Sequence, residues 1–95
     1  MIKNMYCRDK KKCFEDGCLI RHRENKTNNV WIAKYDKSSD RIICLCNDKS
    51  YDTLSGFTKD HYTKTRPDRN PKSNGWYECE YQVDGIWIST NNILC

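Results

Sequence analysis

Apolar and polar positions alternate most clearly in the last quarter of the chain. The runs WYECEYQV (76–83) and IWIST (86–90) are rich in aromatic and β-branched residues, and they flank the dipeptide Asp84-Gly85. This dipeptide is typical of a two-residue type I′ hairpin, in which both turn residues need positive φ. Pairing across the turn places four apolar side chains on one face of the hairpin: Tyr81, Val83, Ile86 and Ile88.

Two further strands are predicted in the middle of the chain. VWIAKY (30–35) places alternate apolar and aromatic side chains on one face, as a half-buried strand does. The turn sequence DKSSD follows, and RIICLCN (41–47) is then a nearly continuous apolar run of strand length. A run of this kind indicates a central strand that is covered on both faces.

The pattern changes to helical spacing in the segment TLSGFTKDHY. Thr53 is a suitable N-cap, and Phe57 and His61 follow four residues apart on one helical face. These signals predict a helix near 53–63. The next stretch, TKTRPDRNPKSNG (63–75), holds both prolines of the chain, so we expect a long loop there.

The first quarter of the chain lacks both periodicities, and its cysteines stand out instead. Their spacing is Cys7-x5-Cys13-x4-Cys18-x3-His22. Three thiolates and one imidazole at such short separations can form a tetrahedral zinc shell. The alternatives are disulfide partners or buried thiols for the cysteines, and an ordinary surface histidine for His22. A shell of four protein ligands leaves no open position for a catalytic water, so the predicted cofactor is one structural Zn²⁺.

The order and spacing of these ligands resemble the CCCH zinc-finger family, which Gly17, Arg21 and Arg23 also fit. The resemblance implies a zinc finger at residues 1–26, followed by a small body at 27–95. The expected fold class is α+β: a small four-stranded, mostly antiparallel sheet with one helix, preceded by an irregular N-terminal finger. A chain of 95 residues buries only a limited core, so a bound metal would add stability that it needs.

The net charge of +4 comes from the first 26 residues, which hold eight Lys and Arg against four Asp and Glu. A basic segment that carries aromatic residues favours phosphate binding, although a short lysine run is also common in solvated loops. Basic side chains would contact phosphates, and the aromatic rings would stack on bases. The candidate nucleic-acid-binding residues are Tyr6, Arg8, Lys10, Lys11, Lys12, Phe14, Arg21, Arg23, Arg66, Arg69 and Trp76.

Two short motifs in the body carry a second resemblance. TLSG (53–56) begins the predicted helix, and NGW (74–76) enters the hairpin. Over about residues 50–88 the chain resembles the RAMA-type modules found beside DNA methylases and in some chromatin proteins. It departs from their pattern at Gly56 and Phe57, where small alanines are usual, and in its long proline-containing loop. The resemblance implies association with nucleic acid, with recognition of modified bases as one form of it.

Other features leave alternatives open. Cys44, Cys46, Cys79 and Cys95 can form a second metal site or pack as buried thiols. A nucleophilic pair of Cys79 with His61 would lack a glycine-rich oxyanion loop, so we do not expect an enzyme. The sequence has no export signal and no apolar run of bilayer length, so an intracellular protein, cytoplasmic or nuclear, is expected.

The sequence therefore supports two functional hypotheses. The first is a small zinc-binding protein that binds RNA or DNA, two partners that the sequence does not distinguish. The alternative is a protein-interaction adaptor or short viral regulator in which the zinc is purely structural. Such an adaptor would bind a protein partner through the hairpin aromatics and the loop at 64–75.

Overall fold

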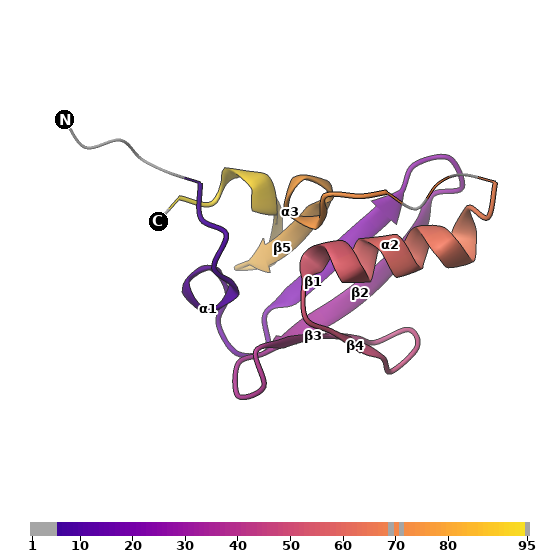
Figure 1. Cartoon of the computed structure of the whole chain (residues 1–95). Coiled ribbons are helices and arrows are strands. Elements are labelled where there is room, and N and C mark those ends of the chain that lie inside the picture. The colour runs from indigo at the N-terminus through magenta and orange to yellow at the C-terminus, as the bar shows by residue number, and fades with distance from the viewer. Residues whose placement is uncertain (1–5, 69, 71, 95) are drawn as a thin grey trace.

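The computed structural model describes residues 6–68, 70 and 72–94. Within these residues six strands form one antiparallel sheet in the order β4-β3-β2-β1-β5-β6 (Figure 1). The strands are β1 (Leu19–Glu24), β2 (Asn29–Asp36), β3 (Arg41–Cys44), β4 (Ser50–Tyr51), β5 (Cys79–Val83) and β6 (Ile86–Ser89). The described residues also form one long helix, α2 (Leu54–Thr65), and three short helices: α1 (Lys10–Cys13), α3 (Gly75–Glu78) and the 3-10 helix η1 (Thr90–Asn92).

The α+β class, the antiparallel sheet and the single main helix are confirmed, but the predicted number of four strands is wrong, because the described residues form six. The two additional strands are β1 and β4. The helix-facing residues of β1 are Ile20, His22 and Glu24, all of which are buried. Two of these three are polar, so alternating burial does not appear as alternating hydrophobicity. β4 has two residues, which is too short for any sequence pattern.

β1 lies at the centre of the sheet, in the stretch where an irregular finger was predicted. It pairs with β2 through the adjacent hairpin and with β5 on its other side, where His22 lies opposite Cys79. The chain runs as a meander from β1 to β4, crosses the sheet as α2, and returns to pair at the free edge of β1 (Figure 1). The N-terminal quarter is therefore part of the sheet.

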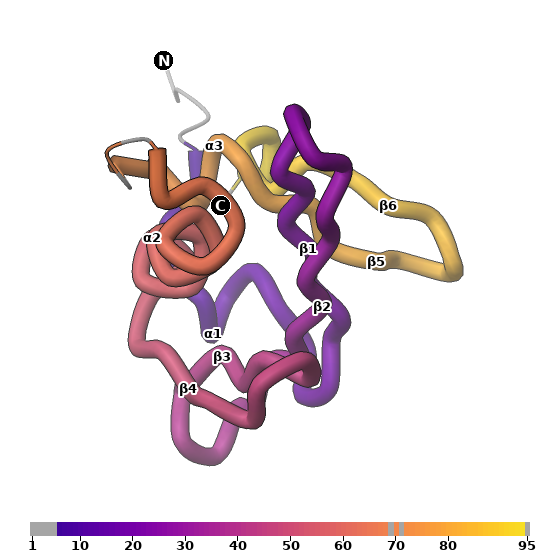
Figure 2. The backbone as a smooth tube through the Cα atoms, turned by 90° about the vertical axis from the view of Figure 1, so that its right-hand side faces the viewer, coloured from indigo at the N-terminus to yellow at the C-terminus, as the bar shows by residue number. Residues whose placement is uncertain are grey.

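The main core lies between α2 and one face of the sheet (Figures 1 and 2). The buried apolar residues that form it are Phe14, Ile20, Ala33, Tyr35, Ile42, Cys44, Leu54, Phe57 and Cys79. β5 and β6 extend away from α2 in Figure 2, so the far end of this hairpin lies outside the cover of the helix.

Two locally encoded features are confirmed. α2 begins as predicted, with Thr53 Oγ1 accepting a hydrogen bond from the Gly56 amide at 2.9 Å. The β5–β6 turn has positive φ at both central residues, 51° at Asp84 and 79° at Gly85. The hairpin also has the predicted register. Each of these features depends on the conformational preferences of a few consecutive residues.

The middle strands are confirmed with one correction. β2 covers the predicted 30–35 segment, but β3 ends at Cys44, and Leu45 lies in the following turn with 50% of its surface exposed. β3 lies between β4 and β2 and is therefore an interior strand, but only Ile42 and Cys44 are buried, so the prediction that both faces are covered is wrong. The apolar run of residues 41–47 continues past the end of the strand into a surface turn.

The motifs TLSG and NGW are in direct contact at the start of α2. The Gly75 amide donates a hydrogen bond to Ser55 Oγ at 2.9 Å. A Cβ atom at position 75 would lie 2.2 Å from the Leu54 carbonyl carbon and 2.4 Å from the Ser55 nitrogen. Glycine is thus the only residue that fits this contact, which brings Trp76 onto Phe14 with ring centroids 5.7 Å apart.

Candidate functional site

The four predicted zinc ligands lie in different elements. Cys7 is buried and disulfide-bonded, Cys13 ends α1, Cys18 precedes β1, and His22 is buried in the middle of β1. Among the described residues, no three His, Cys, Asp or Glu side chains are placed to hold a metal ion. Zinc binding by this set stays a prediction, and it would require reduction of Cys7 and rotation of His22 out of the buried face.

In the second set of cysteines, Cys44 and Cys46 interact with each other at the end of β3, whereas Cys79 begins β5. Cys44 and Cys79 are buried free thiols, and Cys46 is an exposed free thiol. Cys95 lies outside the described residues. Burial raises the pKa of Cys79 far above its ordinary value, so this side chain stays a neutral thiol at pH 7. Cys44 and Cys79 thus pack as small apolar groups in the core.

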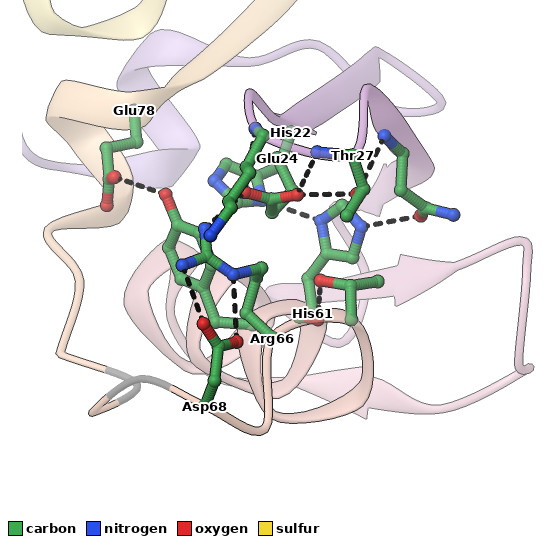
Figure 3. Close-up of polar contacts among 11 residues, drawn as sticks. His22, Glu24, Thr27, His61, Arg66, Asp68 and Glu78 are labelled. Carbon is green, nitrogen blue, oxygen red and sulfur yellow. Dashed lines mark hydrogen bonds and ion pairs between the residues drawn. The ribbon is translucent and has the colours of Figure 1, made fainter.

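His22 and His61 form a buried pair between β1 and α2 (Figure 3). Their Nδ1 atoms are 2.7 Å apart, and His61 Nε2 is 2.8 Å from Asn29 Oδ1. The Asn29 oxygen can only accept a hydrogen bond, so His61 carries its proton on Nε2 and accepts from His22 at Nδ1. Burial, together with the neighbouring His22, lowers the pKa of His61 to about 4. The His61 ring is therefore neutral at pH 7.

Glu24 is the buried anion beside this pair (Figure 3). Its carboxylate accepts hydrogen bonds from the Lys26 amide at 2.9 Å, from the Thr27 amide at 2.7 Å and from the Thr27 hydroxyl at 2.5 Å. Arg66 Nη1 donates a further bond at 3.0 Å, and Arg66 also pairs with Asp68. These donors, the Thr27 hydroxyl foremost, lower the pKa of Glu24 to about 2.

The polar network around Glu24 joins three parts of the fold that are distant in sequence. Glu24 ends β1, Arg66 follows α2, and Tyr62 of α2 donates from its hydroxyl to Glu78 of α3 at 2.7 Å. Donors and acceptors in this network are directed at one another (Figure 3). We therefore interpret the network as a structural connection between the sheet and the helices. It accounts for Arg66, which the sequence placed among the phosphate-binding residues.

Several other predicted nucleic-acid contacts also have partners inside the fold. Lys10 Nζ donates to the backbone oxygen of Asp40 at 2.6 Å and to that of Asp52, and it lies 3.5 Å from the Asp40 carboxylate. Arg21 pairs with Glu80 at 2.8 Å on the face of the sheet opposite α2. Phe14 is 2% exposed, which leaves no ring face for a base.

A second part of the predicted set is exposed on α1 or in contact with the segment that precedes it. Arg8, Lys11 and Lys12 are exposed, and 61% of the Tyr6 surface is exposed. The Arg8 guanidinium carbon lies 5.6 Å from the Tyr6 ring centroid and 5.4 Å from that of Trp76. We call Tyr6, Arg8, Lys11, Lys12 and Trp76 the N-terminal patch. Arg23 is exposed on β1 away from it, and Arg69 lies outside the described residues.

Glu24 organises this region although the sequence pattern does not single it out, and Lys10 contacts acidic residues of the fold and not the predicted phosphates. A usable signal existed for Glu24, because Thr27 follows three residues later in a polar turn, where it can donate to a carboxylate. No local signal identifies the partners of Lys10. Asp40 and Asp52 follow it by 30 and 42 residues and reach it only through the fold.

No family model, curated protein or solved structure matches this chain. The two resemblances noted in the sequence therefore remain resemblances of short motifs. In the part of the chain that the structure describes, no helix has both the length and the apolar character that crossing a bilayer requires.

Proposed function

We propose that this chain is a nucleic-acid-binding domain that contacts its ligand through the N-terminal patch. The observation that carries the proposal is the placement of the Arg8 guanidinium over the rings of Tyr6 and Trp76, in the same segment of the chain as the exposed Lys11 and Lys12. The excess positive charge of the chain also lies in this first segment. The cations can contact phosphates, and the exposed ring beside them can stack on a base.

Arg8 is held in a defined orientation. Its Nη1 donates to the Cys7 carbonyl at 2.8 Å, and its Nη2 donates to Asn91 Oδ1 at 2.9 Å. A planar guanidinium that lies on aromatic rings keeps part of its edge available for a phosphate oxygen, and it loses little entropy on binding. Lys11 and Lys12, both exposed on α1, supply further positive charge. Lys10 is excluded from this role because its ammonium group is directed at Asp40 and Asp52.

Trp76 connects the patch with the second sequence resemblance. It belongs to the NGW motif, and the contact between Gly75 and the start of α2 fixes its position. One face of Trp76 packs on Phe14, while Arg8 lies over its ring. A motif resembling modules found with DNA methylases thus contributes a ring to the surface that we assign to nucleic acid.

A salt titration tests the proposal. Binding of a fluorescent single-stranded oligonucleotide of mixed sequence is measured by anisotropy at several salt concentrations. Three cations should give a log–log slope of about −2 to −3, with a dissociation constant of about 10⁻⁶ to 10⁻⁴ M at physiological salt. The double substitution Lys11→Ala/Lys12→Ala should flatten the slope by about 1.5. Tyr6→Ala should weaken binding by about 1 to 3 kcal/mol without changing the slope.

The matched control is Lys26→Ala/Lys64→Ala, which removes the same charge at the other end of the molecule. Lys26 lies in the β1–β2 turn and Lys64 in the last turn of α2, both exposed and far from α1 (Figure 1). The proposal requires this control to bind with nearly the wild-type slope. Equal loss in both double variants would indicate a response to net charge alone. Undetectable binding at low salt would reject the function.

A further inference from the structure

A groove separates the start of β1 from the tip of the β5–β6 hairpin. β1 and β5 pair only from Ile20 to His22, and beyond Ile20 the two strands diverge. The resulting cavity has a volume of 760 Å³, which is within the usual range for ligand sites. Its lining residues are Cys13, Glu15, Asp16, Gly17, Cys18, Leu19, Tyr81, Gln82, Val83 and Asp84.

The charge of this groove is opposite to that of the chain. Glu15, Asp16 and Asp84 line it and are exposed, whereas none of the described residues that line it is Lys or Arg. The whole chain carries 17 Lys and Arg and a net charge of +4. Two of the acids lie on the α1–β1 loop and the third on the hairpin turn, so negative charge borders the groove on both sides. Asp16 Oδ1 also accepts a hydrogen bond from the Lys37 amide at 2.9 Å.

The floor between these acids is uncharged. Leu19, Tyr81 and Val83 supply apolar surface, and the half-buried side chains of Cys13 and Cys18 line the groove beside them. The same hairpin face continues past the groove through Ile86, which is 65% exposed. An exposed apolar surface with a polar rim is typical of an interaction site.

We propose that this groove binds an extended segment of a partner protein in which Lys or Arg residues alternate with aliphatic residues. An extended chain directs alternate side chains to opposite sides, so aliphatic side chains can enter the floor while their basic neighbours reach the rim. Electrostatic complementarity selects a basic segment over an acidic one. The site lies apart from the N-terminal patch and does not depend on the proposed nucleic-acid function.

The test uses the peptide acetyl-KVKVK-amide with acetyl-EVEVE-amide as the matched acidic probe. Binding to the full chain is measured by isothermal titration calorimetry at low salt. The basic peptide should bind, and the acidic peptide should not. The double variant Glu15→Gln/Asp84→Asn should bind the basic peptide about tenfold more weakly, because two exposed charge pairs are lost. Asparagine suits the positive φ of 51° at position 84, so the hairpin turn is retained.

Asp48→Asn is the matched control, because Asp48 is also an exposed aspartate with positive φ, 59°, in the β3–β4 turn. It should bind the basic peptide as the wild type does. Alkylation of thiols then locates the peptide: bound peptide should slow the modification of Cys13 and Cys18, which line the groove, and leave the exposed Cys46 unchanged.

Three outcomes would overturn the proposal. The first is equal affinity for the two peptides, and the second is unchanged affinity in Glu15→Gln/Asp84→Asn. The third is self-association of the chain, seen by sedimentation, that disappears in the same double variant, because a second copy would then be the occupant. Loss of oligonucleotide binding has no bearing on this site, so the two proposals can fail separately.

Discussion

Replacing Gly75 by alanine should be among the most destabilising single-methyl changes in this chain. The added Cβ would lie 2.2 Å from the Leu54 carbonyl carbon, whereas ordinary contacts between carbon atoms are about 3.5 to 4.0 Å. Both neighbouring groups belong to the backbone at the start of α2, so no side-chain rotation relieves the clash. α3 would have to move away from α2 by more than 1 Å, by the difference between these distances.

The cost follows from what this movement breaks. Overpacking a core typically costs about 1 to 3 kcal/mol, and loss of the bond from the Gly75 amide to Ser55 Oγ adds about 1 kcal/mol. We therefore expect a loss of about 3 kcal/mol or more, a large share of the roughly 5 to 14 kcal/mol available to a domain of this size. With an m-value of about 1 kcal/mol/M, the urea midpoint should fall by about 3 M.

Gly56→Ala provides the matched control, because Gly56 also lies in the first turn of α2. There the nearest atom to the added Cβ is Thr53 Oγ1 at 3.3 Å, and alanine gains about 0.5 to 1 kcal/mol over glycine in a helix. The control should thus stay within about 1 kcal/mol of the wild type. Urea unfolding followed by tryptophan fluorescence and circular dichroism measures both variants. A Gly75→Ala protein as stable as the Gly56→Ala protein would refute the close contact on which the estimate depends.

Two further predictions concern the buried polar groups. The pKa of His61 is lowered to about 4 in the folded state, so between about pH 6.5 and 4 the unfolded chain binds a proton that the folded chain does not. Stability should therefore fall with falling pH in this window. His61→Gln should reduce the loss between pH 7 and 5 by about 2 kcal/mol, measured by urea titrations at both pH values. Parallel curves for the two proteins would contradict this assignment. Lys10→Ala should lower the free energy of unfolding by about 1 to 2 kcal/mol, because it removes hydrogen-bond donors to the backbone oxygens of Asp40 and Asp52. Lys12→Ala is the control and should change the free energy of unfolding by less than about 0.5 kcal/mol in the same urea assay. Similar losses in both variants would contradict the inward position of Lys10.

The features that the sequence predicted correctly have short-range causes. Thr53 caps α2 through an amide three residues away, and Asp84-Gly85 sets the hairpin because both residues adopt positive φ. In each case the conformational preference and the structure it produces lie within a few residues. The resulting alternation also fixes which side chains of the hairpin share a face.

The features that the sequence did not predict depend on partners far along the chain. Arg66 and Glu24 are separated by 42 residues, so a basic residue in a polar loop carries no local sign of its buried acid. The sequence pattern does not predict β1, because its inward positions include the polar residues His22 and Glu24. Their burial is compensated by His61 and Arg66, which contact them only in the folded protein. Cysteine spacing alone suggested a separate finger for a segment that the sheet uses as its central strand.

The central position of β1 has a consequence for dividing this chain. A shortened chain that begins after Glu24 would lose the strand that lies between β2 and β5, and both of those strands would then present open hydrogen-bonding edges. Open edges of this kind favour pairing between molecules and aggregation. The first quarter of the sequence therefore cannot be removed without opening the sheet. A ligand that binds to this segment binds to the part of the chain that also contains the strand joining β2 to β5.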